Sequence, residues 1–262
     1  MTTFASALRL HAVVERSDAR LDGAVAVRRC AQYRKAFRWA AVSYPADVLS
    51  LDAPSAWIRR HGVSIDVGDG DELETALSAG VDPLRVIIHQ CGPQAAPVRD
   101  VVDAGVGRVV VNSPMNLAEL AATAFRRQRV LIEVTDRPVE RLVKDVVASD
   151  RLDLIGLHRR LTPGEPGAPA VVATIAAMQR IAKQHGVIPA RLSLADVDVA
   201  NWGRHAVDLN AISDAIGDAV EAGCIGARFG RPAVNVSPSA AALVRSVDGN
   251  DARLRQIQQL GS

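Results

Sequence analysis

The stretch from residue 38 to residue 46 ends in side chains that could take part in chemistry. It is an apolar run of small and β-branched residues that reaches a hydroxyl at Ser43 and then a proline at Pro45. Such a run is typical of a strand buried on both faces, and we expect it to open a barrel. The carboxyl ends of parallel strands are where α/β barrels keep their active sites. Ser43 is therefore predicted to point to the place where chemistry would sit.

Other reactive side chains fall at the predicted ends of later strands. The residue types of a metal-dependent hydrolase occur there, namely Asp66, Glu133, His158, Asp196 and Asp198. No His-x-His or His-Glu-x-x-His spacing accompanies them, so we predict no metal site. Cys91 follows a strand, but its spacing of two from His89 supplies no oriented base, and we expect an inert buried thiol. Trp202 is the one tryptophan that we expect could cover a ligand.

Arginines gather at the predicted mouth of the barrel. Arg159 and Arg160 end the sixth predicted strand, Arg228 and Arg231 are placed at the end of the eighth, and Arg204 follows the seventh. One interpretation is a site for an anion or small ligand, because guanidinium groups suit carboxylate or phosphate and barrels commonly hold anions beside their last two loops. The other is pairing with nearby acids such as Asp196. We favour the second, since adjacent strand residues face opposite ways and Arg159 and Arg160 cannot both point inward.

Short β-branched runs recur at intervals of about 20 to 40 residues, each followed by an amphipathic segment. This alternation indicates βα units and a parallel sheet. We predict one (β/α)8 barrel of the TIM type, a single domain spanning residues 1–262. An open doubly wound sheet is the alternative, but no Gly-x-Gly-x-x-Gly follows any strand. The eight predicted strands are 38–46, 63–67, 85–89, 108–112, 129–134, 152–158, 191–199 and 224–228.

The composition is that of a folded protein in a reducing compartment. Of 262 residues, 48% are hydrophobic, and 31 basic against 29 acidic residues give a net charge of +2 spread along the chain, which indicates no nucleic-acid surface. Three widely spaced cysteines argue against a disulfide framework or a zinc site. Charges interrupt the first 21 residues, which excludes a signal peptide or a membrane span there. We therefore expect a cytoplasmic protein without membrane or nucleic-acid partners.

Six stretches match, in order, the short motifs of one known enzyme family. Residues 41–43 (Ala-Val-Ser) correspond to the family motif Ala-Val-Lys, and residues 156–161 (Gly-Leu-His-Arg-Arg-Leu) correspond to Gly-Leu-His-x-His-Ile. In the other four stretches, residues 66–73 correspond to the family motif Asp-Val-Ala-Ser-Gly-Gly-Glu-Leu, 89–92 to His-Gly-Asn-Asn, 105–113 to Gly-Val-Gly-x-Ile-Val-Val-Asp-Ser, and 228–231 to Glu-Pro-Gly-Arg. Together, over roughly residues 25–240, they resemble the barrel of the fold type III enzymes that use pyridoxal phosphate, above all the diaminopimelate decarboxylases. The resemblance implies a pyridoxal phosphate-binding barrel.

The resemblance breaks at the positions that carry the family's chemistry. The lysine that forms the Schiff base corresponds to Ser43, whose hydroxyl cannot form an imine. The histidine that stacks on the pyridine ring corresponds to Arg160, and the glutamate on the pyridine nitrogen to Arg228. The glycine triplet that binds phosphate corresponds to residues 195–197 (Ala-Asp-Val). The chain's three lysines are predicted on helices outside the barrel, at Lys35, Lys144 and Lys183.

The family's residues are kept at five positions, Asp66, Glu72, His158, Gly230 and Arg231. The resemblance implies that these residues, with Arg160 and Arg228, line the cofactor site, and that no catalytic residue remains. The family's C-terminal β domain, which supplies further active-site residues and much of the dimer interface, has no counterpart before Ser262. We expect a barrel that kept its scaffold and lost the chemistry of its cofactor.

The expected function is that of a pseudoenzyme related to lysine biosynthesis. It is expected to hold no cofactor and to bind a small anionic ligand or a protein partner such as a homologous decarboxylase. The sequence does not decide between a monomer and a dimer. The alternative is a decarboxylase or racemase that holds pyridoxal phosphate non-covalently or needs a partner subunit. A cofactor over Asp66, His158 and Arg231 would favour that alternative. A mouth filled by Trp202, Tyr44 and arginines would count against it.

Overall fold

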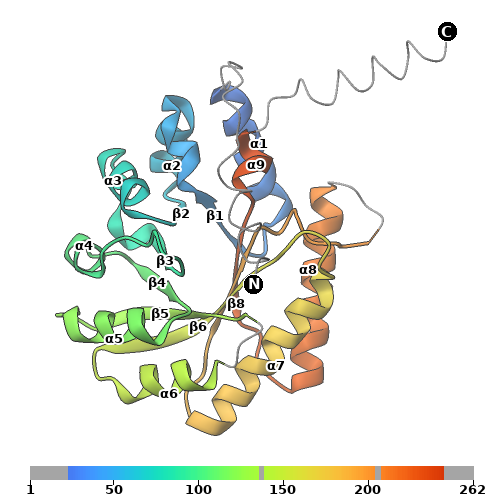
Figure 1. Cartoon of the computed structure of the whole chain (residues 1–262). Helices are drawn as coiled ribbons and strands as arrows, with labels where there is room; N and C mark the ends of the chain where they lie inside the picture. The colour runs from blue at the N-terminus through green and yellow to red at the C-terminus, as the bar shows by residue number, and fades with distance from the viewer. Residues whose placement is uncertain (1–22, 136–138, 204–207, 245–262) are drawn as a thin grey trace, which may run out of the picture. The chain divides into compact units, whose positions relative to one another are not determined.

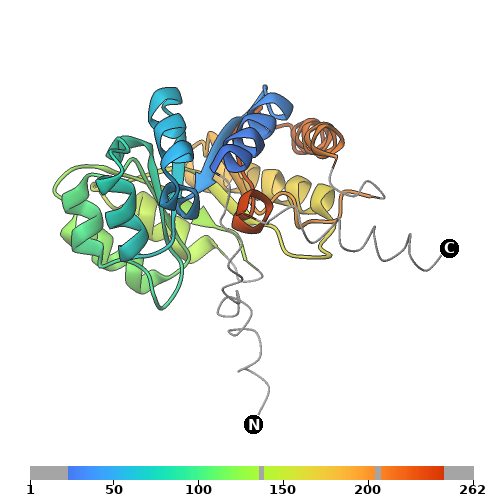
Figure 2. The ribbon, with the colours of Figure 1, turned by 90° about the horizontal axis from the view of Figure 1, so that it is seen from above.

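A computed structural model describes residues 23–135, 139–203 and 208–244. Residues 23–244 form one compact unit, in which eight parallel strands close into a barrel in chain order. Figure 1 shows the helices following one another around the strands, and Figure 2 gives a second view of the helices outside them. The predicted (β/α)8 barrel is confirmed for the described residues. Both ends of the predicted domain, 1–22 and 245–262, lie outside the described residues.

Strands and helices alternate along the chain between a helix before the first strand and a short helix after the last. The strands are β1 (Ala41–Pro45), β2 (Ser64–Val67), β3 (Val86–Gln90), β4 (Arg108–Val111), β5 (Gln128–Glu133), β6 (Leu152–Arg160), β7 (Arg191–Ala195) and β8 (Ala233–Ser237). The helices are α1 (Gly23–Ala36), α2 (Asp52–His61), α3 (Gly70–Ser78), α4 (Val98–Ala104), α5 (Pro114–Thr123), α6 (Glu140–Ala148), α7 (Gly167–His185), α8 (Leu209–Ala227) and α9 (Ala240–Val244), with 3-10 turns at η2 (Ala46–Ser50) and η3 (Pro83–Arg85). Within the described ranges, none of these helices combines the length and apolar character needed to cross a membrane.

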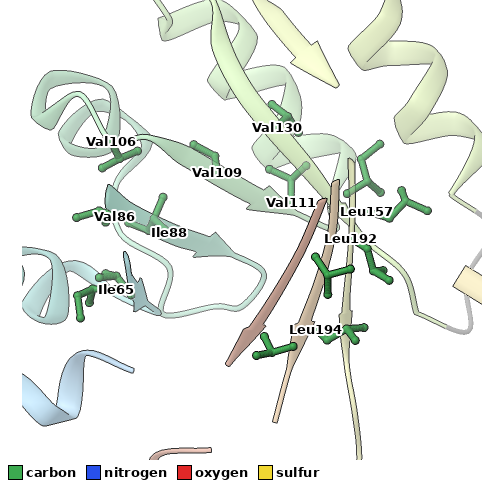
Figure 3. Close-up of a cluster of buried hydrophobic side chains, with 14 of the residues drawn as sticks. Ile65, Val86, Ile88, Val106, Val109, Val111, Val130, Leu157, Leu192 and Leu194 are labelled. Carbon is green, nitrogen blue, oxygen red and sulfur yellow. The ribbon is translucent and has the colours of Figure 1, made fainter. Parts of the chain in front are cut away.

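Alternate side chains of the strands face outward and pack against the helices. Figure 3 shows part of this layer, including Ile88 on β3, Val111 on β4 and Leu157 on β6. They belong to one buried cluster with helix side chains such as Val143 on α6 and Ile175 on α7. Because burying a branched apolar side chain contributes about 1.5–3 kcal/mol, this layer is the main source of stability for the ring.

The other strand side chains face the inside of the barrel. A separate small cluster of Ile87, Val110 and Leu131 lies there on β3, β4 and β5. Bulky branched residues usually dominate the interior of such barrels. Here polar residues hold many of the inward positions, among them Ser43 on β1 and Asn235 on β8, both buried. The interior is therefore built from hydrogen bonds as much as from apolar packing.

The prediction of the eighth strand is wrong. Residues 224–228 contain the end of α8 and its cap, Arg228, which has a left-handed φ of 49°. In α8 the buried residues Ile212, Ile216 and Val220 recur at a spacing of four, the period of a helix that packs on the barrel. The eighth strand is β8, which pairs with β7 and β1. A five-residue apolar run taken alone does not distinguish a helix end from a strand.

Gly156 on β6 is a position where two backbones come very close together. A Cβ atom there would lie 2.0 Å from the carbonyl oxygen of Arg191 on β7. We expect Gly156→Ala to lower the free energy of unfolding by about 2 kcal/mol or more, because the pairing of β6 with β7 must open. The matched control is Gly226→Ala, at an open position of α8, which should raise stability by roughly 0.5–1 kcal/mol. Urea unfolding measures both, and equal effects of the two changes would contradict the close approach.

Candidate functional site

Ser43 lies inside the barrel toward the carboxyl end of β1. Its side chain is fully buried, and its Oγ accepts a hydrogen bond of 2.9 Å from Asn235 Nδ2 on β8. The pairing of β1 with β8 closes the ring. The residue predicted to face the chemistry therefore lies at the pairing of β1 with β8, which closes the barrel. It is held there by an amide that the sequence analysis did not single out.

Asp66 and His89 form the centre of the polar interior. His89 Nε2 on β3 lies 3.2 Å from Asp66 Oδ1 on β2, and the two side chains are 8% and 14% exposed. Burial alone would raise the pKa of Asp66. The hydrogen bond and charge of His89, together with the nearby hydroxyls of Ser43 and Ser237, outweigh burial and hold that pKa below its ordinary value. Asp66 is therefore a carboxylate at neutral pH.

His158 is the second histidine of the interior. Its Nδ1 on β6 lies 3.1 Å from Ser193 Oγ on β7, and its ring meets that of His89 edge to face with the centroids 4.8 Å apart. Burial, and then the positive charges of His89 and Arg160, push the pKa of His158 well below its ordinary value. His158 is therefore a neutral imidazole, able to accept a hydrogen bond on one nitrogen and donate from the other.

Four buried atoms of this network lack a hydrogen-bond partner within the described residues. They are Asp66 Oδ2, His89 Nδ1, His158 Nε2 and Asn235 Oδ1. Buried polar groups in folded proteins are nearly always satisfied by protein or ordered water. The interior therefore has hydrogen-bonding capacity that water or a small polar ligand would take up.

Glu133 is the last residue of β5, and Cys91 directly follows β3. Asn112 Nδ2 donates to Glu133 Oε2 at 2.6 Å and to the carbonyl oxygen of Cys91 at 3.3 Å. Burial, and then the Glu133 carboxylate, raise the pKa of the Cys91 thiol far above its ordinary value, which makes the thiolate of a nucleophile unfavourable. No group of three or more potential metal ligands occurs in 23–135, 139–203 or 208–244.

The arginines at the carboxyl end of β6 are paired with acids. Arg160 donates to Asp196 Oδ2 at 2.7 Å, and Arg159 pairs with Glu165. Burial would lower the pKa of Arg160, but the charge and hydrogen bond of Asp196 raise it, so the pair stays ionic. The second interpretation of these arginines, pairing with nearby acids, is confirmed for Arg159 and Arg160. Arg204 lies outside the described residues.

The predicted position of Arg228, Gly230 and Arg231 at the carboxyl end of the eighth strand is wrong. All three precede β8, because Arg228 caps α8 and the strand starts only at Ala233. They therefore lie at the amino-terminal end of the barrel, opposite Ser43, where the Arg231 guanidinium stands 5.5 Å from the centre of a Trp39 ring. The structure separates these three residues from Asp66, His158 and Arg160, so the seven predicted cofactor-site residues do not form one site.

Glu72 fixes the loop after β2. Its Oε2 accepts the backbone N–H of Gly68 at 2.6 Å, while the Asp69 side chain accepts the backbone N–H of Glu72 at 2.8 Å. This reciprocal pair is a capping arrangement for the start of α3. Burial raises the pKa of Glu72, although the Gly68 hydrogen bond opposes that shift. Glu72 has a structural role here, and a role in holding a cofactor stays a prediction.

Trp202 and Tyr44 are each fixed by a hydrogen bond to a backbone carbonyl. Trp202 Nε1 donates to the carbonyl oxygen of Val197 at 2.6 Å, and its ring packs against Gly167 at the start of α7. The Tyr44 hydroxyl donates to the carbonyl oxygen of Cys30 on α1 at 2.6 Å, so this side chain faces the helix layer. The Arg160–Asp196 pair lies at the carboxyl ends of β6 and β7.

The described residues do not fit pyridoxal phosphate held through a lysine. Lys35, Lys144 and Lys183 are exposed on α1, α6 and α7, on the outside of the barrel. Ser43 offers a hydroxyl in place of an amine. At the end of β7, where the resemblance implies a phosphate-binding glycine, Asp196 carries a carboxylate that would repel a phosphate.

Comparison with known proteins identifies the kind of barrel. Residues 24–140 match the family model described as pyridoxal-dependent decarboxylase, pyridoxal binding domain. The barrel resembles those of the fold type III decarboxylases. This likeness confirms the resemblance that the six short stretches of sequence predicted.

The matching proteins include several diaminopimelate decarboxylases. That of Mycobacterium leprae is 28% identical over 162 residues, covering 51% of this chain and 34% of its own. That of Actinosynnema pretiosum subsp. auranticum is 32% identical over 115 residues, covering 44% and 26%. The match thus spans between about a quarter and a third of the length of these relatives. The solved diaminopimelate decarboxylase of M. jannaschii has a TM-score of 0.69 at 14% identity, covering 86% of this chain and 60% of that one.

The lowered pKa of His158 makes stability depend on pH. Below about pH 6.5 the unfolded chain takes up a proton at this position that the folded protein does not, so stability falls as the pH is lowered. We expect His158→Gln to make the fall in unfolding free energy between pH 6.5 and pH 5 shallower by up to about 1.4 kcal/mol per pH unit. Urea unfolding across this range measures the slope. The exposed His61→Gln is the matched control, and an unchanged slope in His158→Gln would contradict the neutral assignment.

Proposed function

We propose that this chain is a decarboxylase-like barrel that does not tether pyridoxal phosphate and acts as a pseudoenzyme. The observation that carries the proposal is Ser43, fully buried and hydrogen-bonded to Asn235 at the position that the resemblance gives to the Schiff-base lysine. A hydroxyl cannot form an imine with an aldehyde. The exposed positions of the three lysines on the outer helices support the same conclusion.

We propose that the mouth of the barrel binds a protein partner. The arginines that suggested an anionic ligand there are neutralised by Asp196 and Glu165, which makes an anion at the mouth unfavourable. The likeness of this barrel to that of a diaminopimelate decarboxylase supports such a decarboxylase as the partner, and with it a link to lysine biosynthesis. Mixing the two purified proteins and measuring the mass of the eluted species tests this proposal. A species containing both chains is expected, and separate elution at micromolar concentrations would contradict it.

The alternative function is an enzyme that holds pyridoxal phosphate without a covalent bond. The unpartnered atoms Asp66 Oδ2 and His158 Nε2 favour it, because they would give a polar ligand hydrogen-bonding partners inside the barrel. The carboxylate of Asp196 opposes it. Decarboxylation of diaminopimelate by the purified chain, alone or mixed with a catalytically inactivated partner decarboxylase, would establish this alternative in place of the pseudoenzyme.

Pyridoxal phosphate and borohydride test the proposal directly. We expect no imine absorption band beyond that of the unfolded chain, and no cofactor fixed to a specific lysine after reduction, because no lysine reaches the mouth. Absorbance spectra and mass spectrometry of the digested protein measure these two outcomes. An authentic diaminopimelate decarboxylase is the positive control. Stoichiometric labelling of one lysine, abolished by changing only that lysine to arginine, would overturn the proposal.

A further inference from the structure

Three arginines stand at the amino-terminal end of the barrel, opposite Ser43. Arg108 is the first residue of β4, Arg129 the second of β5 and Arg191 the first of β7. Each is two residues before an inward-facing side chain of its strand, namely Val110, Leu131 and Ser193. Because strand side chains alternate between the two faces of a sheet, the three arginines face the interior of the barrel at its amino-terminal end.

These arginines have no acidic partner. Across the described residues, no ion pair involves any of the three, and the one hydrogen bond that Arg108 makes is a long one, 3.4 Å to Ser64 Oγ. The carboxylate of Asp153, beside Arg129 in the sheet, lies 3.9 Å from Arg127 instead. Asp66 on β2 is in register with Ile87 on β3, which is in register with Arg108, but the Asp66 carboxylate makes its ion pair with His89. The three arginines at the amino-terminal end therefore outnumber the acids near them, and none forms an ion pair within the described residues.

The charges of the three side chains act on one another. Burial, and then the positive charges of Arg191 and Arg129, lower the pKa of Arg108, while Asp66 acts in the opposite direction. Arg108 is half-buried, so water screens its charge only in part, whereas Arg129 and Arg191 are exposed at the opening. An anion between them would relieve the repulsion and satisfy the free N–H groups.

We propose that the amino-terminal end of this barrel binds a small oxyanion, either inorganic phosphate or the phosphate group of a small phosphomonoester. Planar guanidinium groups present paired N–H donors that match the oxygens of a phosphate, and three of them around one opening offset both of its negative charges. The proposed site is separate from the mouth, where Arg159 and Arg160 are already neutralised. It also does not depend on whether the chain is a pseudoenzyme.

Calorimetric titration with inorganic phosphate, and separately with glycerol phosphate, tests the site at a fixed ionic strength set with sodium chloride. We expect saturable binding of one anion per chain to the wild-type protein. Tighter binding of the ester would identify a phosphorylated metabolite as the ligand class, and tighter binding of phosphate would identify the free ion. Absence of saturable binding of both would overturn the proposal.

Variants of the two exposed arginines assign the position of the site. Arg129→Gln and Arg191→Gln should each weaken binding by about tenfold or more, since each removes a charge-assisted hydrogen bond. Arg180→Gln, at an exposed position on α7, is the matched control and should leave the affinity unchanged. Thermal unfolding verifies that all three variants fold. Equal losses in all three, or no loss in the first two, would contradict a site at the amino-terminal end of the barrel.

Discussion

Closure of the ring between β1 and β8 is the constraint on which the rest of the structure depends. A closed barrel turns every second strand residue into a narrow interior, so polar residues there must satisfy one another. At the pairing of β1 with β8, Asn235 and Ser43 meet this requirement in part, and the hydroxyl of Ser43 in turn lies near the Asp66 carboxylate. Asn235 Oδ1 and Asp66 Oδ2 have no hydrogen-bond partner within the described residues. A long side chain in place of Ser43 would have to displace this network. The residue on which the proposed loss of imine chemistry rests is therefore also a residue at the β1–β8 pairing that closes the fold.

The two ends of the barrel differ in their electrostatics. At the carboxyl end, buried Asp66 is charged, His158 is neutral, and each arginine of β6 has its own acid. At the amino-terminal end, the inward-facing Arg108, Arg129 and Arg191 form no ion pair within the described residues. The resemblance placed the positive charge of Arg228 and Arg231 at the mouth, but the fold carries these residues to the opposite end. Arginines without an ion pair within the described residues thus lie at the end of the barrel opposite Ser43.

Much of the fold could be predicted from the sequence, because seven of the eight strands coincide with short runs rich in branched apolar residues. The eighth strand was missed although polar Asn235 and Ser237 alternate with Val234 and Val236, as polar and apolar residues also do in β2. A search for alternation with a period of two would have found it.

The site was predictable in residue types but not in partners. Asp66 and His158 were expected at strand ends, whereas their partners His89 and Ser193 come from strands far away in the sequence, at separations of 23 and 35 residues. Register between strands determines such pairs, and no local pattern encodes it. For the same reason the inward direction of Arg108 became evident only once β4 was placed in the ring.

The central claim is that no amine reaches the interior of this barrel. A crystal structure of the protein soaked with pyridoxal phosphate measures it most directly. The account predicts Ser43 Oγ in hydrogen-bond contact with Asn235 and the side chains of Lys35, Lys144 and Lys183 outside the ring. Continuous electron density from any lysine nitrogen to the aldehyde carbon of the cofactor would contradict it.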